Sequence, residues 1–186
     1  MTSRPMLPFL LLSSAILVGA PSASEGAEGP RTDGGARRAA PVDFTLETSA
    51  GKNRSLSEHR GKVVVVFYED RHHTETNART KEALARYGEK EKLGEKVVIL
   101  AVANLKGLDF VPASSFARKA IRAIASRVGI EIWMDWKGAV ATALGAADAD
   151  ANVVVVDKSG AVTMRARGAV SESDEKALFE AVKNAL

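Results

Sequence analysis

Three runs of mostly β-branched residues, separated by segments with helical periodicity, constrain the fold of this chain most strongly. They are Val63–Tyr68 (VVVVFY), Val97–Ala103 (VVILAVA) and Val153–Val156 (VVVV). Uninterrupted apolar runs of this length are typical of strands that are buried on both faces of a sheet. Such strands, alternating with helices, predict an α/β fold with a mixed central β-sheet flanked by helices.

The remaining segments complete this architecture. Further strands are expected at residues 44–47 and 132–134, and helices at 74–92, 114–128, 140–144 and 171–186. Lys158-Ser159-Gly160 is a turn that would join the third run to residues 161–167 as a C-terminal β-hairpin. The last helix closes the fold and begins with Ser171-x-x-Asp174, the pattern of a capping box. The motif D-x-x-G-A-V occurs at Asp135 and again at Asp157, and we expect both turns at the same edge of the sheet.

The helix expected after Ser114 is amphipathic and basic. Its apolar residues recur every four positions and should face the core: Phe116, Ala120, Ile124 and Val128. Its basic residues lie away from that face and should be solvated: Arg118, Lys119, Arg122 and Arg127. Attachment of this helix to a membrane surface is the disfavoured alternative, because the core needs the apolar face.

Three segments resemble the thioredoxin-like redoxin superfamily, which includes peroxiredoxins and periplasmic thiol-disulfide reductases. PVDFTLETSAGKNRSLSEHRGKVVVVFY is similar to the opening of that family, MDWKGAVATALGA to its D..G.va.alGv segment, and VVVVDKSGAV to its hairpin. The order FYEDRHH, MDWKG, VDKSG is most similar to the small YtfJ-type periplasmic proteins, which also lack the usual thiol pair. The resemblance covers residues 42–186 and implies a thioredoxin-like fold there.

The chain departs from the family at its reactive site, because it contains no cysteine. By the resemblance, the two thiol positions fall at His72 and Glu75, and the family's cis-proline falls at Ala151. Thiol-disulfide exchange and peroxide reduction both need a thiolate, which no other side chain replaces. A cis bond before a non-proline residue costs ~3 kcal/mol, so the peptide before Ala151 should be trans. We therefore expect no thiol redox activity, and we assign no catalytic residue and no cofactor.

The loop at the former thiol site still carries polar side chains, among them Asp70, His72, His73 and Glu75. Imidazole and carboxylate groups are good ligands for zinc and copper, so a metal site is one interpretation. The favoured interpretation is a solvated loop whose acids complement the start of the following helix. We assign no metal ligand here and describe these residues, with Ala151, as a vestigial active-site loop.

The N-terminus has the features of an export signal. Leu7–Ala20 is an apolar run of about 14 residues, shorter than the ~20 of a spanning helix, and small residues follow it. We expect a signal peptide at 1–23, a flexible leader at 24–41 and a thioredoxin-like domain at 42–186, with an uncleaved anchor as the alternative. Loss of Arg4, the signal's one charged residue, changes the net charge from +3 to +2. Such a small charge argues against nucleic-acid binding.

The resulting hypothesis is a periplasmic, non-enzymatic protein that binds a peptide or a periplasmic protein, without stable membrane insertion once the signal is cleaved. The expected groove lies between the Glu69–Thr76 loop, the Asp148–Asn152 segment and the Asp157 turn. The alternative is a metal-binding protein that uses His72 and His73.

Overall fold

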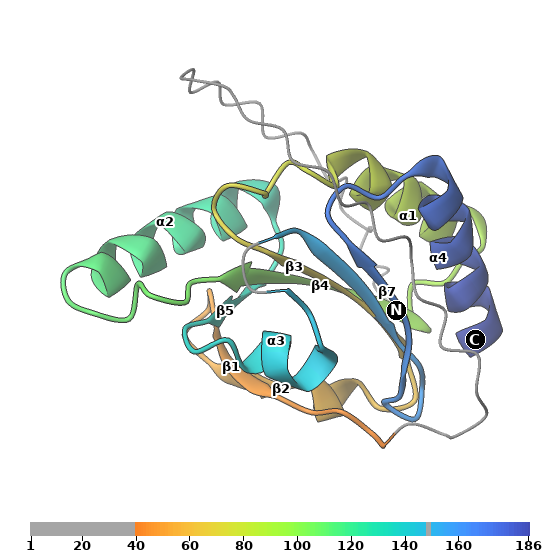
Figure 1. Cartoon of the computed structure of the whole chain (residues 1–186), viewed down its shortest axis with the longest axis horizontal. Helices are drawn as coiled ribbons and strands as arrows, with labels where there is room; N and C mark the ends of the chain where they lie inside the picture. Colours follow the sequence, from red (N-terminus) through yellow and green to blue (C-terminus); the bar gives the residue numbers. More distant parts are fainter. Residues whose placement is uncertain (1–39, 148–149) are drawn as a thin grey trace, which may run out of the picture.

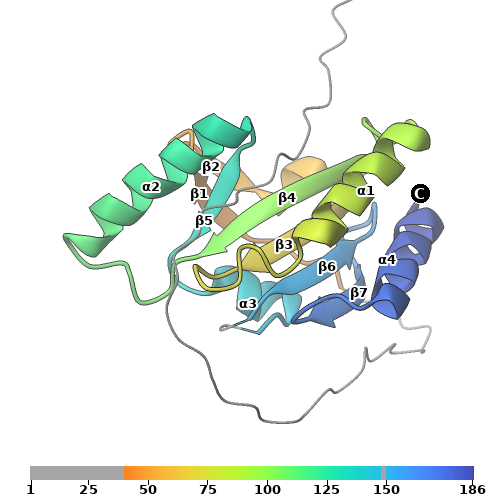
Figure 2. The same ribbon diagram turned by 90° about the horizontal axis from the view of Figure 1, so that it is seen from above.

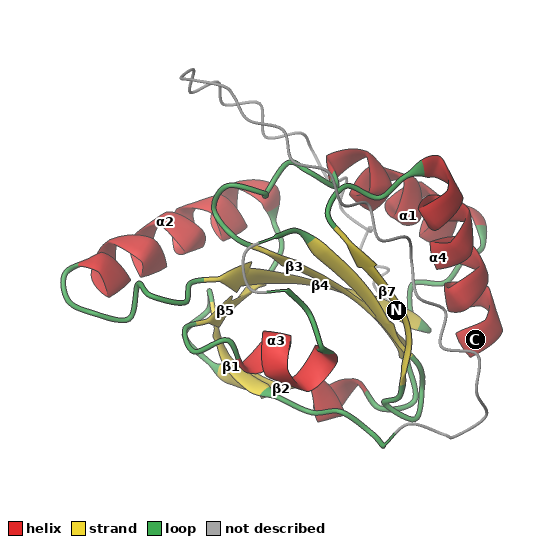
Figure 3. Cartoon of the chain, in the orientation of Figure 1, coloured by secondary structure: helices red, strands yellow, loops and turns green. Residues whose placement is uncertain are grey.

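The computed structural model describes residues 40–147 and 150–186, which form one seven-stranded sheet with helices on both faces (Figures 1 and 3). The strand order is β2-β1-β5-β4-β3-β6-β7. The strands are β1 (Thr45–Thr48), β2 (Asn53–Ser55), β3 (Val63–Glu69), β4 (Val97–Asn104), β5 (Ile132–Asp135), β6 (Asn152–Val156) and β7 (Val162–Arg167). The helices are the 3-10 helix η1 (Leu56–His59), α1 (Ala78–Lys90), α2 (Ala113–Val128), α3 (Ala139–Leu144) and α4 (Glu172–Ala185). The expected signal peptide and residues 24–39 of the leader lie outside the described residues.

Strand direction decides which loops meet. Strands β3, β4 and β5 are parallel, so their carboxyl ends share one edge of the sheet. Strand β6 runs antiparallel to β3 and begins at that same edge, where Asn152 pairs with Tyr68. Strand β7 then forms a hairpin with β6, and α4 closes the chain. The predicted α/β class, with its mixed sheet and C-terminal hairpin, is confirmed.

The core has two layers because side chains alternate along each strand. On one face, Val64, Val66 and Tyr68 of β3 join η1 and α3 in one apolar cluster. On the other face, the intervening Val63 and Phe67 join α1 and α4 in a second cluster. Figure 1 shows these two helices on the face of the sheet opposite α3. Every residue of β3 is buried, as expected of a central strand.

Two helices begin elsewhere than the sequence predicts. Helix α1 starts at Ala78 rather than at residue 74, because turns occupy residues 71–77. The Asn77 side chain, instead of capping α1, donates to the carbonyl of Gly168 and accepts from the N–H of Val170. Helix α2 begins at Ala113, so the predicted cap Ser114 lies inside its first turn. Strand β2 and helix η1 were not predicted.

The two Asp-Gly turns lie at opposite edges of the sheet, and the predicted shared edge is wrong. Asp135 ends β5 and caps α3 by accepting from the N–H groups of residues 137, 139 and 140. Asp157 follows β6, which runs the other way, and its turn binds the N-terminal segment through Gly160 O and the N–H of Val42. The Asp157 turn therefore cannot border a groove with the Glu69–Thr76 loop.

The predicted apolar face of α2 is also wrong in part. Phe116 is 71% exposed and Ala120 is exposed as well. The helix instead turns a neighbouring stripe towards the sheet, and these residues are half-buried: Ala117, Ile121, Ile124 and Val128. Figures 1 and 2 show the reason, because the Ala113 end of α2 reaches past the sheet. Within residues 40–147 and 150–186, no helix has the length and apolarity needed to span a membrane.

Candidate functional site

The loop that follows β3 is organised by Asp70. Its Oδ1 accepts from the N–H of His72 at 2.8 Å and lies 2.7 Å from Nδ1 of His73. Burial alone would raise the pKa of this carboxyl group. The hydrogen bonds from His72 and His73, together with the charges of both imidazoles, outweigh burial and hold the pKa of Asp70 below its usual value. Asp70 is thus a structural centre of the turn.

The two histidine rings do not share a partner. His72 accepts a hydrogen bond at Nε2 from Nε of Arg71 at 2.9 Å, while His73 is held by Asp70. Among the described residues, no group of three or more His, Asp and Glu side chains is placed to hold one metal ion. The polar side chains of this turn hydrogen-bond to one another.

Ala151 lies near the start of this loop. It directly precedes Asn152, the partner of Tyr68, so it sits near the end of β3. Its carbonyl accepts from the N–H of Gly168 at 2.7 Å, and the residue is fully buried. The one cis peptide bond in the described part of the chain precedes Pro112, so the bond before Ala151 is trans, as expected. Ala151 therefore presents no surface to a ligand.

A buried ion pair next to the loop was not among the predicted site residues. Glu69, the last residue of β3, contacts Nζ of Lys81 through Oε2 at 2.5 Å, and their side chains are 9% and 13% exposed. Burial raises the pKa of Glu69, although Lys81 opposes this shift. The second oxygen, Oε1, accepts no hydrogen bond from a described residue. Lys81 also donates to the carbonyl of Thr74 and lies 5.5 Å from the ring centroid of Phe67.

This ion pair forms the polar end of an apolar cavity of about 190 Å³ between α1, α2 and the sheet. Its apolar wall comes from β4, α2 and the start of β5: Ile99, Ala103, Ile121, Ile124, Val128 and Ile132. Thr74 and Glu75 of the loop also line it, so Glu75 is the one predicted site residue that does so. The cavity is left unfilled because the side chains of β4 that face α2, such as that of Ala103, are small. Along β4 the residues on this face are half-buried, whereas Leu100 and Val102 on the other face are buried.

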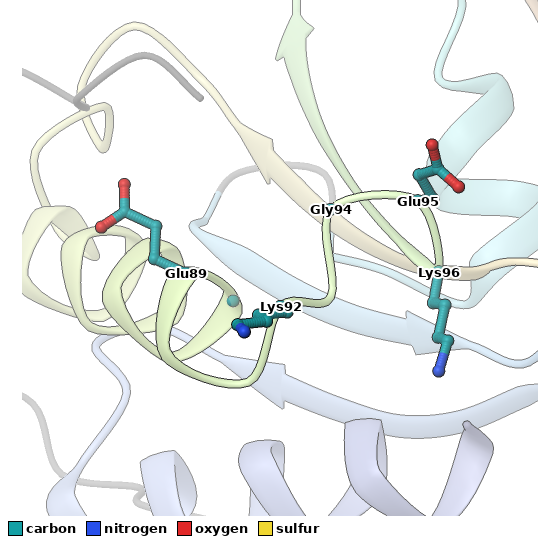
Figure 4. Close-up of a pocket in the computed structure, with 6 residues that line it drawn as sticks. Glu89, Lys92, Gly94, Glu95 and Lys96 are labelled. Carbon is teal, nitrogen blue, oxygen red and sulfur yellow. The ribbon is translucent and has the colours of Figure 1, made fainter. Parts of the chain in front are cut away.

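A larger depression of about 480 Å³ lies where α1 ends, but it lacks converging groups (Figure 4). Its rim consists of glycines and four exposed charged residues, and the labelled side chains point away from one another: Glu89, Lys92, Glu95 and Lys96. Since ligand sites combine an apolar lining with convergent polar groups, the smaller cavity is the better candidate.

Comparisons with known proteins agree with the α/β fold. The profile of a family described as the AhpC/TSA family matches residues 36–165, well over half of the chain. No curated protein sequence matches the chain.

Solved structures match it at low identity. A DsbF homologue from Corynebacterium diphtheriae is 16% identical with a TM-score of 0.64, covering 87% of this chain and 96% of that one. An exposed lipoprotein thioredoxin from Streptococcus pneumoniae is 17% identical, with a TM-score of 0.51 and coverage of 77% and 99%. The bacterioferritin comigratory protein of Xanthomonas campestris, studied for alkyl peroxide reduction, is 17% identical, with a TM-score of 0.54 and coverage of 76% and 90%. The profile match confirms the redoxin superfamily. The structural likenesses confirm the thioredoxin-like fold, while closeness to YtfJ-type proteins stays a prediction.

Proposed function

The chain belongs to the AhpC/TSA family, and from this premise we propose that it is a non-redox binding protein of the periplasm. Its ligand is an apolar side chain of a peptide or partner protein, held in the cavity between α1, α2 and the sheet. The observation that carries the proposal is this open apolar cavity beside the loop where the family places its thiols. The family's own chemistry requires a thiolate, and no residue of this chain supplies one.

The volume of the cavity limits the size of the group that can bind in it. An apolar cavity of ~150 Å³ accepts benzene, whereas sites for drug-sized ligands begin near ~300 Å³. A volume of about 190 Å³ falls between these limits. It suits one aromatic ring or one branched aliphatic side chain, and it is too small for a bulky organic cofactor.

The polar end of the cavity adds a second element of recognition. Glu69 Oε1 is a buried acceptor without a partner among the described residues. A buried acceptor left unpaired costs ~1–3 kcal/mol, so an N–H group that reached it would gain much of that energy. A peptide offers both an apolar side chain and a neighbouring backbone N–H. This combination favours a peptide segment over a pure hydrocarbon.

Export rests on the apolar run and small residues of the N-terminal sequence. The structural likeness to an exposed lipoprotein thioredoxin is compatible with it. A metal-binding role for His72 and His73 is the alternative. No observed contact favours it, because each ring is engaged by a different residue of the loop.

The test is selection of binding peptides from a phage-displayed random library on the purified protein, followed by calorimetry with the synthetic peptides. Ala103→Leu fills the cavity and should weaken binding at least about tenfold, since it occupies the volume that an apolar group would fill. Ala120→Leu is the matched control, because it adds the same atoms to the exposed side of α2. Peptides that bind Ala103→Leu as tightly as the parent protein would contradict the proposal. Selection of no peptide, together with no methyl NMR shift at Ile121 or Ile124 when benzene is added, would contradict it as well.

A further inference from the structure

Three large apolar side chains are exposed among the described residues, and all three lie at one end of α2. They are Phe110 (59% exposed), Val111 (82%) and Phe116 (71%). Scattered exposed apolar residues need no explanation, but several at one place mark an interaction site. Phe110 and Val111 precede Pro112, the N-cap of the helix, and Phe116 lies in the first turn of the helix. We call these three residues the α2 tip.

The fold keeps the α2 tip out of the core. The inner side of the helix, with Ile121, Ile124 and Val128, faces the cavity described above. Phe116 is exposed and points away from the sheet, and the end of the helix that carries it extends beyond the sheet (Figures 1 and 2). The sequence-based reason against membrane attachment, namely that the core needs Phe116, therefore does not hold.

The helix next to the tip is basic. Helix α2 contains four basic residues and no acidic one, and Asp109 is the single acid in residues 105–128. Helical spacing places Lys119 and Arg127 on the same outer side as Phe116, with alanines between them, and all are exposed. Basic residues interleaved with apolar ones along one helix side are typical of helices that lie at a membrane interface.

The part of α2 next to the tip is attached to the body of the protein through Arg118. Arg118 donates from Nε to both carboxylate oxygens of Glu47 on β1, at 3.2 and 3.1 Å. Its guanidinium lies 4.5 Å from the ring centroid of Trp136, a distance typical of a cation–π contact. These contacts from the first half of α2 to β1 and to the residue that follows β5 fix the direction in which the tip points.

We propose that the α2 tip docks the protein peripherally on an anionic lipid surface. The two phenylalanines and Val111 enter the headgroup region, while Lys119, Arg122 and Arg127 lie over the anionic headgroups. A lipid surface fits better than an acidic protein, because a stable protein interface needs ~800 Å² per partner, usually with matched shapes. A protruding end with three apolar side chains offers far less area, but it suits insertion between headgroups. The inference does not depend on the proposed ligand cavity.

The test is co-sedimentation of the exported protein with phosphatidylcholine vesicles, with and without phosphatidylglycerol. All variants share one N-terminus, verified by mass spectrometry, so differences between them report on α2. We expect binding that requires phosphatidylglycerol and weakens with added salt. Phe110→Ser/Phe116→Ser should lower partitioning at least about tenfold, because burying even one phenylalanine favours the bound state by such a factor. Lys119→Glu/Arg127→Glu should lower it by about tenfold or more.

The matched control is Lys176→Glu/Lys183→Glu, the same change of charge at exposed positions of α4, which should retain most of the binding. Circular dichroism checks that each variant is folded. In a Phe110→Trp variant, tryptophan emission should shift to the blue and be quenched by brominated lipids. Equal binding to both kinds of vesicle, or loss in the α4 control equal to that in the α2 variant, would overturn the proposal. Absence of binding to both kinds of vesicle would overturn it as well. A dimer, measured by light scattering, that Phe110→Ser/Phe116→Ser abolishes would then show that the tip joins two copies of the chain.

Discussion

One face of the central sheet is tightly packed on one half, which we call closed, and loosely packed on the other half, which we call open. Under α1 and α4, the inward side chains of β3 and β6 are almost completely buried, and Leu178 and Val182 of α4 meet them. Under α2, the corresponding positions of β4 are half-buried, and so is the inner side of the helix. Complete burial gives stability, whereas incomplete burial leaves apolar surface that another molecule can cover.

The side chains explain this difference. The closed half uses Val63 and Val65, whose side chains pack against the helices. The open half has Ala101 and Ala103 on β4, and these leave a gap of about 190 Å³ beneath α2. A smaller apolar hollow of about 150 Å³ lies at the other end of β4, between α1 and α4, but no charged side chain lines it. The cavity beneath α2 combines an apolar lining with the Glu69–Lys81 pair.

Truncating one apolar side chain on each half should show the difference in packing between the two halves most clearly. Leu178→Ala removes a fully buried side chain from α4 and should lower the free energy of unfolding by ~2–5 kcal/mol. Ile124→Ala, on the half-buried side of α2, should cost about 1 kcal/mol or less, because much of its surface is already hydrated. Urea unfolding followed by circular dichroism measures both. Equal losses would show that α2 is packed as tightly as α4.

Enlarging an alanine on each half should produce effects of opposite sign. Ala166→Leu inserts atoms into the filled core beneath α4 and should destabilise the protein by ~1–3 kcal/mol. Ala103→Leu inserts the same atoms into the cavity and should leave stability unchanged or raise it by up to ~1 kcal/mol. Thermal unfolding at neutral pH gives both values. If Ala103→Leu were as destabilising as Ala166→Leu, the cavity would not exist in solution.

The boundary between the halves carries two neighbouring acids with opposite pH responses. The folded-state pKa of Glu69 lies above its usual 4.5, so the folded protein binds more protons than the unfolded chain just above that pH. Stability from Glu69 should therefore fall as pH rises through this window. The folded-state pKa of Asp70 lies below its usual 3.8, so its contribution should fall as the solution is acidified below that value.

Urea unfolding across the acidic range measures these slopes. Glu69→Gln should remove the first slope and Asp70→Asn the second, while Glu95→Gln, at an exposed loop position, should change neither. If Glu69→Gln left the pH profile of the parent protein intact, Glu69 would not titrate as a buried group.

The sequence predicts those parts of the fold that depend on local patterns. The run Val63–Tyr68 identifies a central strand because no polar residue interrupts it, and all of it is buried. The capping box at Ser171 is confirmed by the hydrogen bond that its side chain accepts from the N–H of Asp174. These features need only neighbouring residues, and neighbouring residues are what periodicity measures.

The wrong predictions concern relations between distant elements. Two overlapping stripes of α2, starting at Phe116 and at Ala117, share Ile124 and Val128, and periodicity alone cannot say which stripe meets the sheet. The direction of β6, which decides the edge of the Asp157 turn, is likewise set by pairing with β3. The Glu69–Lys81 pair joins a strand end to a helix twelve residues later, and its only signal was an acid ending an apolar run.

The smallest effect is expected in the loop that replaces the family's thiols. His72→Ala/His73→Ala removes two hydrogen bonds of a partly exposed turn and should cost about 1 kcal/mol or less. Since neither histidine lines the cavity, the double variant should bind the selected peptides with unchanged affinity. Calorimetry with those peptides and with Zn²⁺, on the parent protein and the variant, measures both properties. Micromolar zinc binding that the substitutions abolish would instead identify this loop as the functional site, and the cavity under α2 would then have no role in binding.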